Sequence, residues 1–283
     1  MKKTILMGLA LALTTATFAQ EKKATKEGGA YVRLGLGYAF AHGGNTYTGT
    51  TNAGGSSISY DYKKGSYGAG LSGVVAAGYK FNRNIALELG VGVGIAPTKL
   101  EDKFSNTTPG AAINITTKTY AKTPVYLLPA VVISTGNTLL EPYARVGLAV
   151  NVGGKLIEEM TATGDVGGGT SATAFQKTEY KQRTGIGFQG ALGLKYHINN
   201  RVGIWGEVAG ISQNIYVKSA EVTEATLNGA NVLDTYTTSE RQTNYEFNYT
   251  QSGTPATNAP GTAAAYSNAF SNFGVNLGVS FQF

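Results

Sequence analysis

The sequence predicts an all-β fold, a transmembrane antiparallel up-and-down β-barrel, with eight strands as the first interpretation and ten as the alternative. Three observations favour it. The 283 residues include 39 glycines, 17 tyrosines and 11 phenylalanines but only 14% charged residues, a composition typical of strands. Segments of about ten to fifteen residues alternate between apolar and polar side chains, which is the period of a β-strand. Short and long connections alternate along the chain.

Residues 1–19 are expected to be a secretory signal peptide and not part of the fold. Lys2 and Lys3 precede an apolar stretch from Ile5 to Leu13, and small residues lead to cleavage after Ala19. The alternative, a membrane anchor, is disfavoured because this stretch is too short to span a bilayer. Loss of the two lysines lowers the formal charge from +6 to +4, an excess too small to indicate a nucleic-acid partner.

The first four segments of the body are predicted strands with one apolar face. The first, second and third span 30–40, 68–81 and 85–95, and their aligned apolar faces begin at Val32, Leu71 and Ile85. The fourth, 123–134, is almost continuously apolar, so the direction of its faces stays open. Its Pro124 and Pro129 also weaken the prediction, because proline cannot donate a ladder hydrogen bond.

The remaining four segments complete the predicted barrel. The fifth spans 140–152, the sixth 184–198, and the seventh begins at Val202 and continues irregularly to about Val217. The eighth, 271–283, alternates strictly from Asn272 and ends the chain on an aromatic residue, Phe283. No Asp, Glu, Lys or Arg falls on the apolar face of the seven segments whose faces can be assigned. This avoidance indicates a lipid-facing surface, where a midplane Lys or Arg costs about 2–4 kcal/mol.

The connections sort into two classes. Short ones occupy 82–84, 134–139 and 199–201, and long ones occupy roughly 41–66, 99–118, 154–181 and 218–269. In an antiparallel meander, strict alternation places all the short turns at one end and all the long loops at the other. This is the arrangement of outer-membrane barrels, which have short periplasmic turns and longer extracellular loops. The long connections are interpreted either as hairpins extending the strands or as disordered segments.

Aromatic residues fall near the predicted strand ends, as in the interfacial girdles of membrane barrels. The predicted girdle residues are Tyr38, Phe40, Tyr79, Phe81, Tyr196, Tyr216 and Phe273, with Phe281 and Phe283 toward the turn end.

On these residues the chain resembles the small outer-membrane β-barrel, or porin-like barrel, proteins of Gram-negative bacteria. The resemblance covers Ala30 to Phe283, preceded by a short periplasmic linker at 20–29. It implies location in the cell outer membrane, with outer-membrane lipids around the barrel. In this family the barrel-assembly machinery reads a C-terminal aromatic residue, and Phe283 matches that position with Phe281 and Val279 in phase.

Charged residues on the polar faces are the candidate functional residues. They are Arg33, Lys80, Glu88, Arg145, Lys195 and Glu207, and we expect an interior ion-pair cluster near the turn end. The interior of an eight-stranded barrel is just wide enough for side chains to fill it. The cluster is therefore interpreted as a structural plug, with a charge-lined pore as the alternative. Glycines on the inward face of the loop-side half indicate either a small cavity or strand coiling.

The expected function is a non-enzymatic outer-membrane protein that is structural, presents its loops and has at most limited small-solute permeability. A passive transporter or narrow porin is the alternative, and a lipid A-modifying enzyme is a third possibility, with His42 as base and Ser66 or Ser72 as nucleophile. No spacing supports that pair. With no cysteine and two histidines, no metal or other cofactor is expected. The loops, rich in Tyr, Thr and Asn, are a possible surface for an extracellular ligand.

Overall fold

The structure, a computed structural model, describes residues 28–42, 45–54, 57–108, 112–136, 139–165, 170–250 and 256–283. The expected signal peptide and most of the expected linker at 20–29 lie outside these residues.

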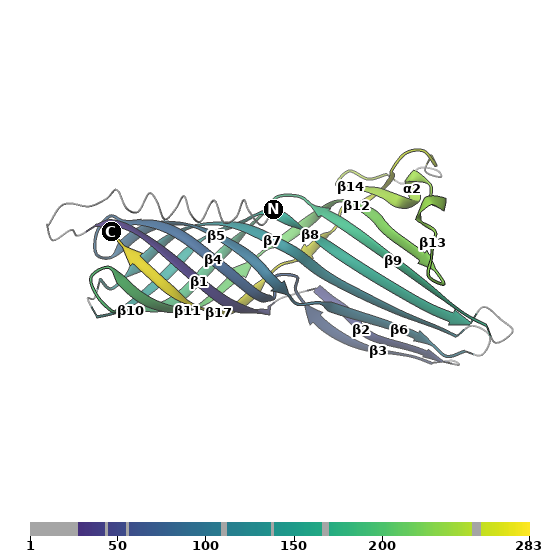
Figure 1. Cartoon of the computed structure of the whole chain (residues 1–283), viewed down its shortest axis with the longest axis horizontal. Coiled ribbons are helices and arrows are strands. Elements are labelled where there is room, and N and C mark those ends of the chain that lie inside the picture. The colour runs from purple at the N-terminus through teal and green to yellow at the C-terminus, as the bar shows by residue number, and fades with distance from the viewer. Residues whose placement is uncertain are drawn as a thin grey trace.

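Eight antiparallel strands pair in a closed ring. The barrel that they form is the part of the molecule that carries the C-terminus in Figure 1. In ring order they are β1 (Gly29–Ala41), β4 (Gly70–Lys80), β5 (Ile85–Pro97), β7 (Ile113–Ser134), β8 (Leu140–Asp165), β10 (Gly185–His197), β11 (Val202–Ser212) and β17 (Asn272–Gln282). The last strand closes the ring on the first, in a register from Tyr31 opposite Gln282 to Ala41 opposite Asn272. The ring thus pairs the backbone groups that an open edge would leave unsatisfied in lipid.

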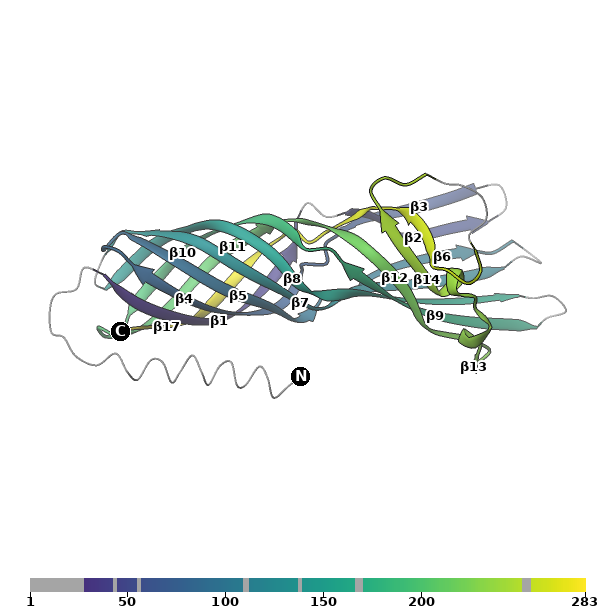
Figure 2. The same cartoon turned by 90° about the horizontal axis from the view of Figure 1, so that it is seen from above.

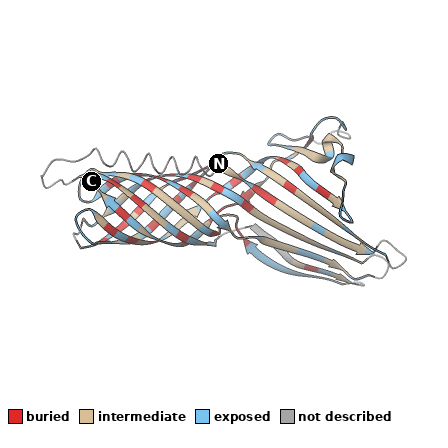
Figure 3. Cartoon of the chain, in the orientation of Figure 1, coloured by how far each residue is buried: buried red, intermediate tan, exposed pale blue. Residues whose placement is uncertain are grey.

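The ring strands expose their apolar faces (Figure 3). Exposed fractions reach 72% at Leu192, 69% at Ile186 and 64% at Val146. In β7, whose faces the sequence left open, Tyr126 and Leu128 point inward and Leu127 and Val131 are exposed. Such a continuous apolar exterior is incompatible with a water-facing monomer and fits a barrel wall in contact with acyl chains.

Beyond the ring, β7 and β8 continue through a local register shift near Val125 into a second, open sheet (Figures 1 and 2). This sheet adds β2 (Asn45–Gly54), β3 (Ser57–Gly65), β6 (Leu100–Asn106), β9 (Ser171–Gln182) and β12 (Asn214–Leu227), in the order β3-β2-β6-β7-β8-β9-β12. Much of the four long connections is therefore strand. We call the end of the barrel that carries this sheet the loop end, and the opposite end, with the short turns, the turn end.

The seventh predicted segment is two strands, because β11 ends at Ser212 and β12 begins at Asn214. After β12 come the short elements β13 (Ala230–Asn231), η2 (Leu233–Thr235), α2 (Thr238–Arg241), β14 (Gln242–Glu246), β15 (Gly261–Ala264) and β16 (Ser267–Ala269). In the described residues these strands pair with β12 or with one another, and none is inserted between two ring strands. Within the same residues, no helix has the length and apolar character needed to cross a membrane.

Candidate functional site: the barrel lumen

Two arginines and two glutamates from four ring strands meet in the lumen. Glu207 is the centre of the group: the Arg33 guanidinium lies 2.9 Å from one of its carboxylate oxygens and the Arg145 guanidinium 2.6 Å from the other. Glu88 lies farther from the same arginines, at 3.7 Å and 3.9 Å. All four side chains are buried, so the opposite charges compensate one another in a site that water barely reaches.

Neutral side chains add hydrogen bonds to the cluster, although Nε of Arg33, Nε of Arg145 and one Glu88 oxygen have no hydrogen-bond partner among the described residues. Tyr31 donates a hydrogen bond to Glu88 (3.0 Å) and Tyr143 donates to Glu207 (2.9 Å). The Asn276 amide also donates to Glu207 at 3.0 Å, and Arg145 donates to Gln189 at 2.8 Å. The Arg33 guanidinium stacks 3.9 Å from the centroid of the buried Trp205 ring, a cation–π contact.

Glycines on neighbouring strands make room for these aromatic rings. Tyr31 lies directly opposite Gly78, and Tyr143 lies directly opposite Gly193. A β-carbon at either glycine would collide with the tyrosine ring across from it. The inward glycines therefore allow rings to lie flat across the barrel wall, with their hydroxyls aimed at the carboxylates.

A second polar group lies closer to the turn end, around Glu141. Its carboxylate accepts hydrogen bonds from Lys80 (2.9 Å) and Ser134 (2.6 Å), and its other oxygen lies 2.9 Å from Nε2 of His197. Lys195 lines the adjoining pocket with Lys80 and Glu141, but no ion pair to it is found among the described residues.

The structure brings together four of the six predicted interior residues, Arg33, Glu88, Arg145 and Glu207. Of the other two, Lys80 pairs with Glu141, and Lys195 lines the pocket beside that pair. The sequence analysis missed Glu141, Tyr31, Tyr143, Gln189, Trp205 and Asn276. Each of these residues lies on the inward face of its strand, an even number of residues from a predicted charged residue or in register with one on a neighbouring strand. Strict use of the two-residue period would therefore have found them.

An apolar cluster fills the lumen toward the loop end. Its buried members are Ala121, Tyr126, Leu128, Ala149, Leu156, Ile215 and Phe270. Phe270 is fully buried at 0% exposure, and its backbone N–H donates to the Gln213 carbonyl at 2.9 Å. The same segment is tied to the opposite wall, where Ser66 and the Tyr67 amide both donate to the Ala269 carbonyl. This apolar cluster is a second filling of the lumen, which the sequence did not predict.

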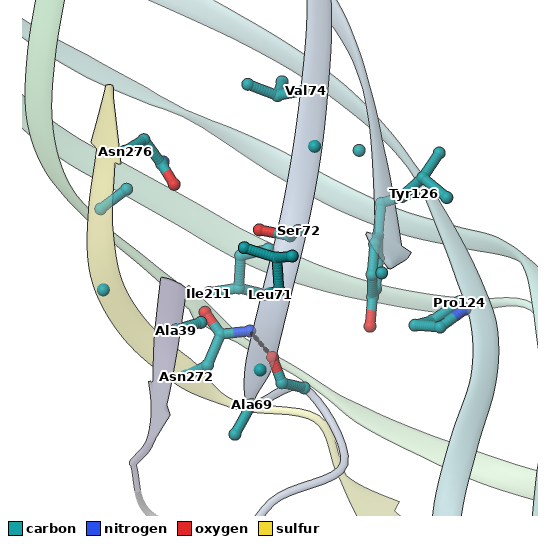
Figure 4. A pocket seen from close by; sticks show the side chains of 18 of the residues that line it. Ala39, Ala69, Leu71, Ser72, Val74, Pro124, Tyr126, Ile211, Asn272 and Asn276 are labelled. Atoms are coloured by element: carbon teal, nitrogen blue, oxygen red, sulfur yellow. Dashed lines mark hydrogen bonds between the residues drawn. The ribbon is translucent and has the colours of Figure 1, made fainter. Parts of the chain in front are cut away.

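A cavity of about 90 Å³ lies in the lumen between the two clusters (Figure 4). Arg145, Gln189 and Asn276 contribute polar groups to its lining, and Tyr126 and Leu128 contribute apolar surface. The Tyr126 hydroxyl has no hydrogen-bond partner in the part of the chain that the structure describes. Of the inward glycines, Gly92, Gly94 and Gly274 line this cavity, whereas a β-carbon at Gly35 would meet the Trp205 ring.

The residues considered for lipid chemistry do not form a site. The His42 ring packs edge-on against Phe273, with 6.0 Å between ring centroids. Ser66 is fully buried and donates to the Ala269 carbonyl. The His42 backbone N–H donates to the Ser271 carbonyl at 3.4 Å, but no hydrogen bond joins the His42 ring to a serine hydroxyl among the described residues. A group of three or more His, Asp and Glu side chains able to hold a metal is also not found in those residues.

The predicted girdle residues are all exposed. Six of them lie on or directly beside ring strands, whereas Tyr216 lies on β12 of the open sheet. Tyr79 and Phe81 contact each other at the turn end, with ring centroids 5.5 Å apart. Phe40 contacts Tyr38 and Phe273 at the loop end, at 5.2 Å and 5.7 Å. Val279, Phe281 and Phe283 are exposed on the outer face of β17, and the Phe283 amide donates to the Ala30 carbonyl at 3.0 Å.

Two carboxylates of the open sheet, outside the ring, have pKa values shifted in opposite directions. Burial raises the pKa of Glu158, and a hydrogen bond from Tyr180 (3.1 Å) offsets this only in part. The Lys155 ammonium, 2.6 Å away, lowers the pKa of the more exposed Glu179.

The two shifts predict opposite effects of pH on stability. A raised folded-state pKa means that the folded state binds the Glu158 proton more tightly, so its contribution is greatest at acid pH and is lost as pH rises through the raised pKa. Glu158→Gln should therefore raise the free energy of unfolding at neutral pH relative to wild type and change it little at acid pH. Glu179→Gln should lower it at neutral pH, because the folded state favours that ionised carboxylate.

Urea unfolding of both variants at acid and neutral pH, followed by Trp205 fluorescence, checks these expectations. A neutral-pH loss in Glu158→Gln would contradict them.

A family model, the outer membrane protein β-barrel domain, matches residues 9–203 of the chain, which include the ring strands β1 to β10. No curated protein matches the chain at a significant level. Among solved structures, the chain is similar to the outer membrane protein OprG from Pseudomonas aeruginosa, with 11% identity, 91% of this chain and 97% of that chain covered, and a TM-score of 0.42. It is also similar to Neisserial surface protein A (NspA), with 12% identity, 91% and 100% covered, and a TM-score of 0.34.

Proposed function

The chain belongs to the outer membrane protein β-barrel domain family, and we propose that its role in the outer membrane is structural and surface-presenting, not enzymatic. In this proposal the eight ring strands span the membrane and the open sheet stands outside the cell. The turn end faces the periplasm, where the barrel-assembly machinery recognises Phe283 together with Phe281 and Val279.

The observation that supports a closed barrel is the filling of the lumen at two levels. The ion-pair cluster of Arg33, Glu88, Arg145 and Glu207 occupies one level, and the apolar cluster around Phe270 occupies the other. A solute would have to displace paired charges at the first and close-packed side chains at the second. Both are costly, since breaking a buried ion pair costs about 3–5 kcal/mol.

A passive transporter or narrow porin is the second candidate, and the cavity between the two clusters favours it. The cavity already occupies part of the path along the barrel axis. Only its two ends would need to open for a small solute to pass.

Conductance of the refolded mature barrel in a planar bilayer tests the two candidates. We expect the wild type to be silent. Arg145→Ala, which removes polar lining on one side of the cavity, and Phe270→Ala, which removes the apolar filling on the other, should each leave one barrier intact and remain nearly silent. The double variant should show openings more conductive than those of either single variant, because the two barriers lie in series.

Discrete openings in the wild type would reject the closed barrel and favour the transporter. A double variant that is folded and still silent would show that other side chains close the lumen. A folded barrel migrates differently on a gel before and after boiling. A variant without this difference would be identified as unfolded.

A further inference from the structure

The outward face of the open sheet carries two rows of charged residues that differ in how the charges are arranged. In the row farther from the barrel, Glu101, Lys118, Glu159, Lys177 and Glu224 lie directly opposite one another on five successive strands. Their charges alternate in sign across every pair. Opposite charges facing each other across strands are favourable, so this upper row compensates itself.

The row nearer the barrel has a single sign. Lys122 on β7 lies opposite Lys155 on β8, which lies opposite Lys181 on β9. Lys218 follows at the bulge in β12, beside Lys181. Like charges directly opposite are destabilising. Among the described residues the only ion pair made by this lower row joins Lys155 to Glu179 at 2.6 Å, which leaves the other three ammonium groups without a carboxylate at ion-pair distance.

The lower row points away from the barrel axis and into the surroundings. The residues next to its lysines along each strand, Ala121, Leu156 and Tyr180, belong to the apolar cluster in the lumen or pack against it. Side chains alternate along a strand, so the lysines project from the opposite, outer face. All of them are exposed.

The lower row also lies at the boundary of the lipid-facing surface. Lys155 follows the exposed Val152 across the register shift between β7 and β8, and Lys218 follows the exposed Tyr216 on the same face of β12. The upper row lies four residues farther along β7, from Lys122 to Lys118, which is about 13 Å at the rise of a strand. The uncompensated charge thus sits where the headgroups of the surrounding leaflet begin.

We propose that Lys122, Lys155, Lys181 and Lys218 form a binding site for the phosphate groups of phosphorylated glycolipids in the outer leaflet. Adjacent strands lie about 5 Å apart, so the ammonium groups that they carry can bind one phosphate together. The bound phosphate would offset the repulsion between the ammonium groups. The site rests on the orientation proposed above, with the open sheet outside the cell. It does not depend on whether the barrel conducts.

A matched pair of triple variants tests the site on the purified, detergent-solubilised protein. One variant carries Lys122→Gln, Lys181→Gln and Lys218→Gln, which leaves the ion pair of Lys155 with Glu179 in place. The control carries Lys103→Gln, Lys118→Gln and Lys177→Gln, which removes the same charge from the same sheet, but from positions on or beside the self-compensating row. Native mass spectrometry titrations with bisphosphorylated lipid A, dephosphorylated lipid A and inorganic phosphate give the affinities.

We expect the lower-row variant to bind bisphosphorylated lipid A on the order of 100-fold more weakly than wild type at low salt, at about fivefold per lysine. The control should change by less than about twofold. The order of thermal stability should be the reverse of the order of affinity loss. The lower-row variant should be at least as stable as wild type, and the control should be less stable because its glutamates lose their partners.

Equal losses of affinity in both variants would overturn the proposal, and so would equal binding of dephosphorylated lipid A. Competition by inorganic phosphate at the same concentration as the lipid would show a free-phosphate site and overturn the assignment to lipid. Because the assay uses purified protein without a membrane potential, a conducting barrel in the bilayer experiment would leave these results unaffected.

Discussion

Replacing Glu207 with alanine should lower the free energy of unfolding by about 3–5 kcal/mol, the largest loss expected for any single interior residue. The Glu207 carboxylate is only 3% exposed and accepts hydrogen bonds from Arg33, Arg145, Tyr143 and Asn276. Its removal leaves two buried guanidinium groups with only the more distant Glu88 between them. Equilibrium unfolding in urea from lipid vesicles, followed by Trp205 fluorescence, measures the loss.

Two comparisons make this expectation specific. Glu88→Ala should cost less, because its arginine contacts are 3.7 Å and 3.9 Å long and its one short hydrogen bond comes from Tyr31. Glu101→Ala, which breaks an exposed pair with Lys103, should cost less than about 1 kcal/mol. An equal loss for Glu88→Ala and Glu207→Ala would refute the central position assigned to Glu207.

Leu192→Arg is expected to have the second largest effect, a loss of about 2–4 kcal/mol in vesicles. Leu192 lies near the middle of β10 and is 72% exposed on the outer face, so an arginine there would project into acyl chains at the midplane. Refolding yield and urea unfolding in phosphatidylcholine vesicles give the result.

Ile198→Arg is the matched control, because it places the same charge on the same face at the turn end of the strand, where Ile198 is also exposed. Near the interface the cost falls to about 0–1 kcal/mol. A loss at Ile198 as large as that at Leu192 would mean that the exposed apolar band is not centred on the ring strands, and the placement of the membrane would have to change.

The wall of the barrel could be read from the sequence because its signal is local. In a strand with lipid on one side and the lumen on the other, apolar and small or polar side chains must alternate. The outward direction of Leu192 or Val146 therefore follows from the residues next to it. The same alternation placed Arg33, Glu88, Arg145 and Glu207 in the interior. The aromatic residues inside were missed because Tyr143 and Trp205 carry apolar rings that a simple polar–apolar division assigns to lipid.

The filling at the loop end and the open sheet could not be read in this way. Phe270 belongs to a stretch without periodicity, and its burial follows from the pairing of β16 with the start of β12, residues that are far apart in the chain. The extension of β7 is rich in Thr and carries Lys118 and Lys122 on one face, and the extension of β8 carries Glu158 and Glu159 on opposite faces, so no continuous apolar face marks the two as strands. The parallel pairing of β2 with β6 likewise depends on contacts that no local pattern encodes.

The continuity of β7 and β8 has a mechanical consequence. These strands contain 22 and 26 residues and run from the barrel wall into the open sheet, and a strand of 26 residues is about 85 Å long. A force that pulls on the sheet along their direction loads the hydrogen bonds between the two strands in shear, so that many must break together. A hinged loop would yield first at its base, whereas this sheet transmits tension directly to the wall and through it to the surrounding membrane.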